Sequence, residues 1–99
     1  MNEGVLIIII APSLEEWMVD LLLEQQDLSG FTTSYVNAHG THTSRLSLLE
    51  QVTGRQQKVQ LVAYGALAVL NRVVTLLENN LSHSDIRYIL MPSLASALI

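Results

Sequence analysis

Near its start the chain carries an unbroken apolar run, Val5-Leu-Ile-Ile-Ile-Ile10, which Pro12 follows closely. Its β-branched residues favour a strand, and apolar side chains at every position require that both faces of the strand be covered. The run is far shorter than the roughly 20 apolar residues of a membrane-spanning helix. It is preceded by Glu3 and by no Lys or Arg, unlike a signal peptide. We therefore expect a buried strand over 5–11, in a soluble cytoplasmic protein with no direct membrane insertion.

The remaining elements follow in the order helix, strand, strand, helix, strand. A helix is predicted from Ser13, where Glu16 completes a capping box. Strands are predicted over 31–36 and 57–64, a second helix over 66–81 and a fourth strand over 86–91. The apolar positions of the first helix recur at helical spacing, at Leu14, Trp17, Met18, Leu21 and Leu22. Those of the second helix are Leu67, Leu70, Val73, Val74, Leu77 and Leu81.

The order βαββαβ predicts an α+β fold, the ferredoxin-like sandwich, with two helices on one face of a four-stranded antiparallel sheet. Ninety-nine residues are too few for two independent cores, so a single domain over 1–99 is expected. The second face of such a sheet would be polar in a monomer, yet the first strand is apolar throughout and Ile89 and Met91 share a face in the fourth. Apolar patches of this kind mark interfaces, and only 14% of the residues are charged. We expect sheets from several subunits to pack on one another.

Charge and composition exclude several function classes. The net charge is −4 and the five basic residues are spread along the chain, so no basic stripe is available for nucleic acid. The absence of cysteine excludes disulfides, thiolate chemistry and Cys-ligated zinc. No Gly-x-Ser-x-Gly elbow and no suggestive order of Ser, His and Asp occurs, so we expect a protein that is not an enzyme.

The polar loop 39–56 between the two middle strands holds the candidate ligand-binding residues. His39 and His42 are candidate metal ligands, because imidazole suits copper, zinc and nickel; alternatively, His39 packs at the strand end and His42 is solvated. Gly40 and Gly54, which bound the loop, could bring backbone N–H groups to an anion, with Arg55 and Lys58 supplying charge. The alternative is that the glycines are simple turns and that Arg55 pairs with Glu50 or with another subunit.

The segment Leu28-Ser-Gly-Phe-Thr-Thr-Ser-Tyr-Val-Asn-Ala-His-Gly40 resembles the strand of PII signalling proteins that enters their long T-loop. Arg55-Gln-Gln-Lys-Val-Gln-Leu-Val62 is similar to the returning strand. The whole chain resembles a small uncharacterised PII-like family, often encoded beside heavy-metal efflux pumps of the resistance-nodulation-division type; CutA proteins share the architecture. The resemblance implies a homotrimer with clefts between subunits and a membrane transporter as partner. It carries a binding role over to Thr32, His39, Gly40, Arg55 and Lys58.

Two departures from the PII pattern bear on the ligand. PII proteins hold ATP phosphates with basic residues at the end of the fourth strand and its tail, whereas the corresponding end here, Met91-Pro-Ser-Leu-Ala-Ser-Ala-Leu-Ile99, has no Lys or Arg. The loop also lacks the tyrosine that PII proteins use for uridylylation, because Tyr35 lies in the strand. The cofactor is therefore unknown. We expect a sensor or regulatory protein that binds a metal ion or an anion near the 39–55 loop. The alternative is an interaction or scaffold module with no ligand.

Overall fold

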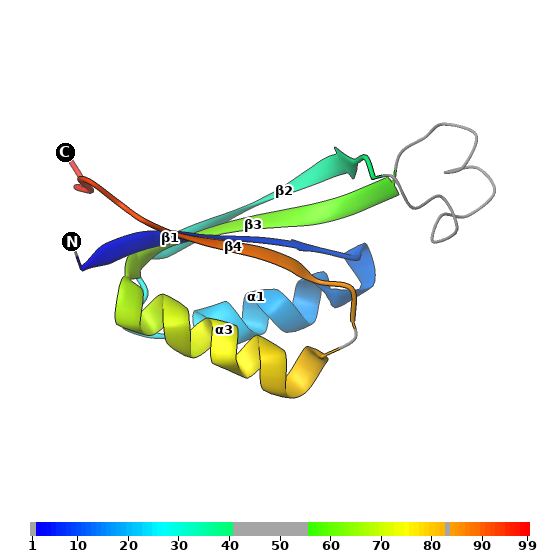
Figure 1. The fold of residues 1–99 in the computed structure, drawn as a ribbon, viewed down its shortest axis with the longest axis horizontal. Coiled ribbons are helices and arrows are strands. Elements are labelled where there is room, and N and C mark those ends of the chain that lie inside the picture. Colours follow the sequence, from blue (N-terminus) through cyan, green and yellow to red (C-terminus); the bar gives the residue numbers. More distant parts are fainter. Residues whose placement is uncertain (1, 41–55, 83) are drawn as a thin grey trace.

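The structure is a computed structural model, and it describes residues 2–40, 56–82 and 84–99. Its sheet has the strand order β2-β3-β1-β4 with every neighbouring pair antiparallel. Both helices cover the same face of that sheet (Figure 1). The ferredoxin-like α+β fold is thus confirmed. In chain order the elements are β1 (Glu3–Ile10), the 3₁₀ turn η1 (Pro12–Leu14), α1 (Glu15–Leu23), β2 (Gly30–Ala38), β3 (Gln56–Ala66), α3 (Leu67–Leu81) and β4 (Arg87–Pro92).

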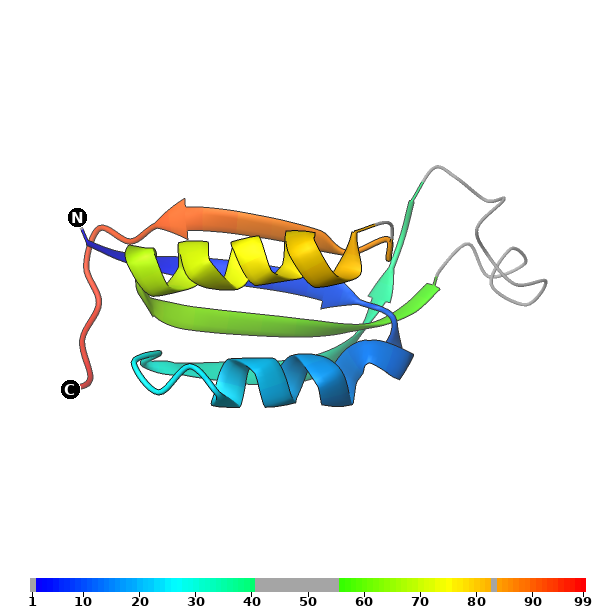
Figure 2. The same cartoon turned by 90° about the horizontal axis from the view of Figure 1, so that it is seen from below.

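The core lies between the helices and one face of the sheet. Directly paired residues of neighbouring strands share a face, and Leu6 of β1 lies opposite Ala63 of β3 and Leu90 of β4. Both helices lie over this face of the sheet (Figure 2). The side chains of β1 and β3 on this face are fully buried, and both helices contribute buried apolar side chains. The buried cluster comprises Leu6, Ile8, Ile10, Met18, Leu22, Val59, Leu61, Ala63, Leu70, Val73, Val74 and Leu77.

The capping box predicted at Ser13 is wrong. Pro12 is the first residue of η1, so Ser13 already lies inside a helical turn, and α1 begins at Glu15 with Leu14 as its N-cap and no side-chain cap bond. The carboxylates of Glu15 and Glu16 still lie in the first turn, where the helix dipole favours negative charge. The apolar stripe is also narrower than predicted, since Trp17 is 37% exposed while Met18 and Leu22 are buried.

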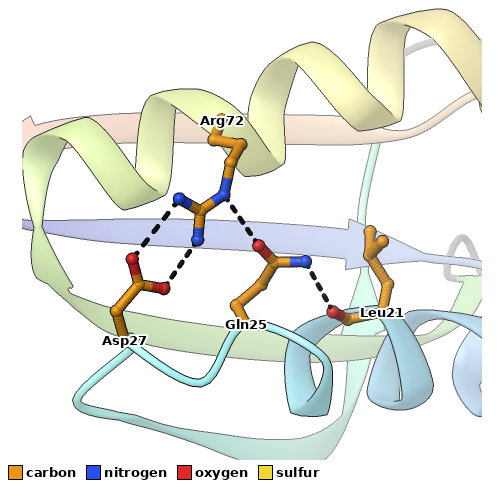
Figure 3. Close-up of polar contacts among 4 residues, drawn as sticks. All are labelled: Leu21, Gln25, Asp27 and Arg72. Atoms are coloured by element: carbon orange, nitrogen blue, oxygen red, sulfur yellow. Dashed lines mark hydrogen bonds and ion pairs between the residues drawn. The ribbon is translucent and has the colours of Figure 1, made fainter.

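The helix layer is fastened by a polar clamp between α3 and the segment that joins α1 to β2 (Figure 3). The Arg72 guanidinium donates to both carboxylate oxygens of Asp27, with N–O distances of 2.6 and 3.4 Å, and its Nε donates to Gln25 Oε1 at 2.9 Å. Gln25 Nε2 in turn donates to the Leu21 carbonyl at the end of α1. These contacts fix the distance between the two helices at one end of the layer.

The second face of the sheet, called the open face below, is covered by no described element (Figure 1). Its centre is apolar, as the sequence predicts, and the two apolar side chains of the edge strand β4 are exposed at 44% for Ile89 and 40% for Met91. None of the described helices is long and apolar enough to cross a membrane. The apolar residues at the centre of the open face are Val5, Ile7, Ile9, Val62, Ile89 and Met91.

Candidate functional site

The β2–β3 hairpin extends beyond the rest of the sheet (Figure 1). β1 ends at Ile10, which pairs with Val59, whereas β2 continues through Ala38, which pairs with Gln56. The last three pairs of the hairpin therefore form a two-stranded arm with no β1 beside them. This arm leads into the loop predicted over 39–56, of which residues 41–55, including the short amphipathic piece 46–52, lie outside the described residues.

A hydrogen bond fixes the base of this arm to the helix layer. The hydroxyl of Tyr35, which pairs with Val59 where the arm leaves the sheet, donates to Glu15 Oε1 at 3.0 Å. The bond and the negative charge of Glu15 both favour the neutral phenol and raise the pKa of Tyr35 above its ordinary value. Tyr35 is 77% exposed, so this hydrogen bond joins the base of the arm to the start of α1 at the protein surface.

On the open face, a basic region lies where the arm begins. Lys58 pairs with Val36 and belongs by strand alternation to this face, yet it is only 8% exposed. Arg87, the first residue of β4, is exposed on the same face and lies beside Ile9 of β1. Neither cation forms an ion pair with another residue in the described part of the chain. Arg87 is not among the site residues that the sequence predicts, because strand alternation does not determine which strands are neighbours.

Two neutral polar side chains complete this region, and the sequence predicts a binding role for neither. Ser34 lies opposite Gln60, and Gln60 lies opposite Ile9, so a row across the sheet runs from Ser34 to Arg87. Arg87 and Gln60 are two strands apart, which is about 10 Å between backbones. We name the set Ser34, Lys58, Gln60 and Arg87 the arm-base cluster. It offers two cations, an amide and a hydroxyl, but Ser34 and Arg87 are three strands apart, or about 14 Å, so only a larger ligand could reach all four groups.

Charge on the open face is distributed unevenly along the strands. Among the residues of the four described strands, Glu3 is the only carboxylate that strand alternation places on this face, and it lies opposite Ala66 at the far end. Six residues separate Glu3 from Ile9, or about 20 Å. The arm-base cluster is therefore positive although the chain as a whole carries net charge −4.

The other predicted anion-binding residues do not all converge on Lys58. Thr32 is on the open face opposite Val62, four residues from Lys58 along β3, or about 13 Å. Gly40 is exposed, and no other heavy atom lies within 4 Å of where its Cβ would be. Arg55 lies outside the described residues. A small anion could therefore contact Lys58 or Thr32, but only a larger ligand could reach both.

The predicted metal site is only partly described. His39 directly follows β2 and is exposed, and His42 lies outside the described residues. No group of three or more His, Cys, Asp or Glu side chains that could hold a metal ion occurs within 2–40, 56–82 and 84–99. Two surface hollows, of about 410 Å³ beside the start of α1 and about 520 Å³ between the end of α3 and β4, contain none of the predicted site residues.

Comparison with known proteins places this arrangement among others of the same fold. Residues 1–99 match the model of a family described as "Protein of unknown function (DUF3240)". No curated protein sequence matches the chain. A DUF3240 family protein from Shewanella baltica has a similar structure, with a TM-score of 0.79 and 20% identity over 100% of this chain and 98% of that one.

Two further solved structures extend the similarity. One is a nitrogen regulatory PII-like protein from Thiomonas intermedia, bound to ADP, AMP and bicarbonate, with a TM-score of 0.73 and 14% identity over 100% of this chain and 98% of that one. The other is CutA from Synechococcus elongatus, with a TM-score of 0.72 and 9% identity over 96% and 80%. At these identities the likeness establishes the fold alone.

Proposed function

This chain belongs to the DUF3240 family, whose function is unknown, and from that premise we propose that it is a single-domain, non-enzymatic, PII-like regulatory protein. It binds a small ligand near the 39–55 loop. Of the two ligand classes that the sequence predicts, a metal ion and an anion, the anion has the better support. The site is the arm-base cluster together with the loop that the arm carries.

The observation that carries this proposal is Lys58. Lys58 is only 8% exposed and no carboxylate in the described part of the chain pairs with it. No buried side-chain nitrogen of the described residues lacks a hydrogen-bond partner, so the Lys58 ammonium group reaches the surface, where an anion can contact it. Arg87 on β4 adds a second positive charge on the same face, and Gln60, two residues from Lys58 on β3, adds hydrogen-bonding capacity. An anion would supply the missing charge. The PII-like protein from Thiomonas intermedia was solved with ADP, AMP and bicarbonate, all of which are anionic.

The proposed assembly is a cytoplasmic homotrimer in which copies of the chain cover one another's open faces. The support is the apolar centre of that face, which no described element of the chain covers. In such an assembly the arm-base cluster lies next to a neighbouring subunit. Ligand binding would order the loop and change its docking on a partner, for which we propose a membrane transporter such as a heavy-metal efflux pump; ordering of a segment is an established switching mode.

Anion binding can be tested by thermal unfolding with inorganic phosphate, bicarbonate and ADP, and with zinc chloride as the metal probe. An anion that binds the folded state at a hundredfold excess over its Kd stabilises it by about 2.7 kcal/mol. We expect a raised midpoint with at least one anion and loss of that rise in Lys58→Gln and Arg87→Gln. Arg72→Gln is the matched control, because it removes the same charge from the helix layer.

Each outcome separates the proposed function from its rivals. An equal loss of the rise in Arg72→Gln would mean that anions act on net charge, and the site would be rejected. A rise with zinc alone, lost in His39→Ala, would favour the metal site. Flat unfolding curves with every probe would favour the interaction or scaffold module that has no ligand.

A further inference from the structure

The segment after β4, residues 93–99, is the most exposed apolar part of the described chain. Leu94 is 90% exposed and Leu98 is 103% exposed, so these side chains touch essentially nothing in their own chain. The last backbone link to the sheet is the bond from Ser93 N to the Glu3 carbonyl, at 3.0 Å. Beyond it, the Ser93 hydroxyl donates to the Ala95 carbonyl, which turns the segment without returning it to the core.

The position of this segment relates it to the open face. It leaves the sheet at the end opposite the hairpin arm and rises away from the helix layer, on the side of the open face (Figure 1). Seen from below, it runs beyond the end of the sheet, from the β4 side toward the β2 side (Figure 2). It follows Pro92, the residue after Met91, whose side chain belongs to the apolar centre of the open face. The segment therefore begins two residues from that apolar surface.

The chemistry of the surfaces decides which one can receive the segment. Residues 93–99 carry no charged side chain, and neither does the apolar centre of the open face. The helices also expose apolar side chains, Trp17 and Leu23 on α1, but these are neighbours in sequence of the exposed carboxylates of Glu16 and Glu24. Other exposed charges of the helix layer are Asp20 on α1 and Arg72 and Glu78 on α3. Burial of leucine side chains against such carboxylates would desolvate them without a partner.

We propose that residues 93–99 of one copy of this chain dock on the open face of a second copy, with Leu94 and Leu98 as the anchoring side chains. The inference rests on the assembly proposed above and adds to it the segment that holds neighbouring copies together. Each copy donates its own segment to one neighbour and receives the segment of another. The exposed leucines of the segment and the apolar centre of the open face therefore cover each other.

The absence of cysteine allows a clean crosslinking test. Leu98→Cys is labelled with a benzophenone maleimide, irradiated, and analysed on a denaturing gel and by peptide mass spectrometry. We expect covalent dimers whose crosslinks map to β1 or β4 of the second copy. Leu23→Cys on α1, where the native side chain is 64% exposed, is the matched control and is expected to give no such dimers.

A second measurement keeps the two proposals distinguishable. Sedimentation measures the protein concentration below which the assembly dissociates. We expect this concentration to be at least tenfold higher for the double variant Leu94→Ser/Leu98→Ser than for the wild type. An unchanged assembly with crosslinks confined to one chain would overturn the docking of the segment and leave the assembly standing. A wild type that is monomeric at micromolar concentration would overturn both. Binding of the wild-type segment to phosphatidylcholine vesicles, with the assembly unaffected by the double substitution, would also overturn the docking.

Discussion

Gly4 lies where the start of α3 meets the sheet, and its lack of a side chain makes that close approach possible. A Cβ at this position would overlap Leu67 Cδ2 and would lie 2.7 Å from the Met91 carbonyl oxygen. The same junction supplies the first N–H of α3 with a partner, because Leu67 N donates to the Asn2 carbonyl at 2.7 Å. The backbone around Gly4 therefore substitutes for the side-chain cap that α3 lacks.

We predict that Gly4→Ala destabilises the fold by about 1–3 kcal/mol, the usual cost of overpacking in a close-packed core. Urea unfolding at a fixed protein concentration would measure it. Gly40→Ala is the control, because open space surrounds that glycine and its φ is not in the left-handed region. Equal stability of Gly4→Ala and the wild type would mean that α3 shifts away from the sheet at little cost.

The Tyr35–Glu15 bond gives a pH-dependent prediction at the same scale. The pKa of Tyr35 is raised above 10.0 in the folded chain, so its contribution to stability is complete below pH 10 and is lost as the pH rises through the folded pKa. Glu15→Gln should lower the Tyr35 pKa toward its ordinary value, because the negative acceptor is removed. Absorbance titration of the tyrosinate, with Tyr35→Phe used to assign the signal, would measure it. Identical titrations of the wild type and Glu15→Gln would contradict the bond.

At the scale of elements, the clamp of Arg72 on Asp27 and Gln25 makes α3 and the α1–β2 connection one unit. The hydrogen bonds from Arg72 hold the pKa of Asp27 below its ordinary value of 3.8. Its contribution to stability is therefore present above pH 4 and is lost as the pH falls through the folded pKa. Both side chains are about half exposed, so water and salt screen the pair.

We predict that Arg72→Ala raises the Asp27 pKa toward 3.8, with only a small, salt-dependent loss of stability. Carboxyl NMR titration of the wild type and the variant would measure the pKa. Arg72→Lys is a graded control, since it keeps the charge but cannot make the paired contacts together with the Nε bond to Gln25. An unchanged Asp27 pKa in Arg72→Ala would show that the clamp is not formed in solution.

At the scale of the whole molecule, the helices cover one face of the sheet, and none of the elements within 2–40, 56–82 and 84–99 covers the other, apolar face. We predict that Ile89→Asp, which places a charge at the centre of the open face, lowers the mass measured by sedimentation toward the 10.9 kDa of one chain. Leu23→Asp is the control, because Leu23 is more exposed, at 64% against 44%, but lies on α1. Dissociation by both substitutions alike would point to general destabilisation rather than to this face.

Local patterns in the sequence were sufficient for the fold. The apolar run 5–10, the helical spacing over 66–81 and the alternation over 31–36 each identify an element, because strand and helix periods are set by the backbone alone. The order of these elements, βαββαβ, then predicts the ferredoxin-like sandwich, because right-handed crossovers place both helices on one face of the sheet. The start of α1 was misplaced, because Ser13 and Glu16 have the spacing of a capping box but Pro12 initiates a 3₁₀ turn first.

Only part of the candidate site follows from the sequence. The family resemblance predicts a binding role for Thr32 and Lys58, the charge of Lys58 favours an anion, and strand alternation places both residues on one face. That Arg87 lies on the same face two strands away from Gln60 depends on β1 pairing with both β3 and β4. The sequence alone determined which side chains alternate and which segments are apolar, because those properties are local. The tertiary structure alone decided which strands are neighbours and which cations lie together, because pairing joins residues far apart in the chain.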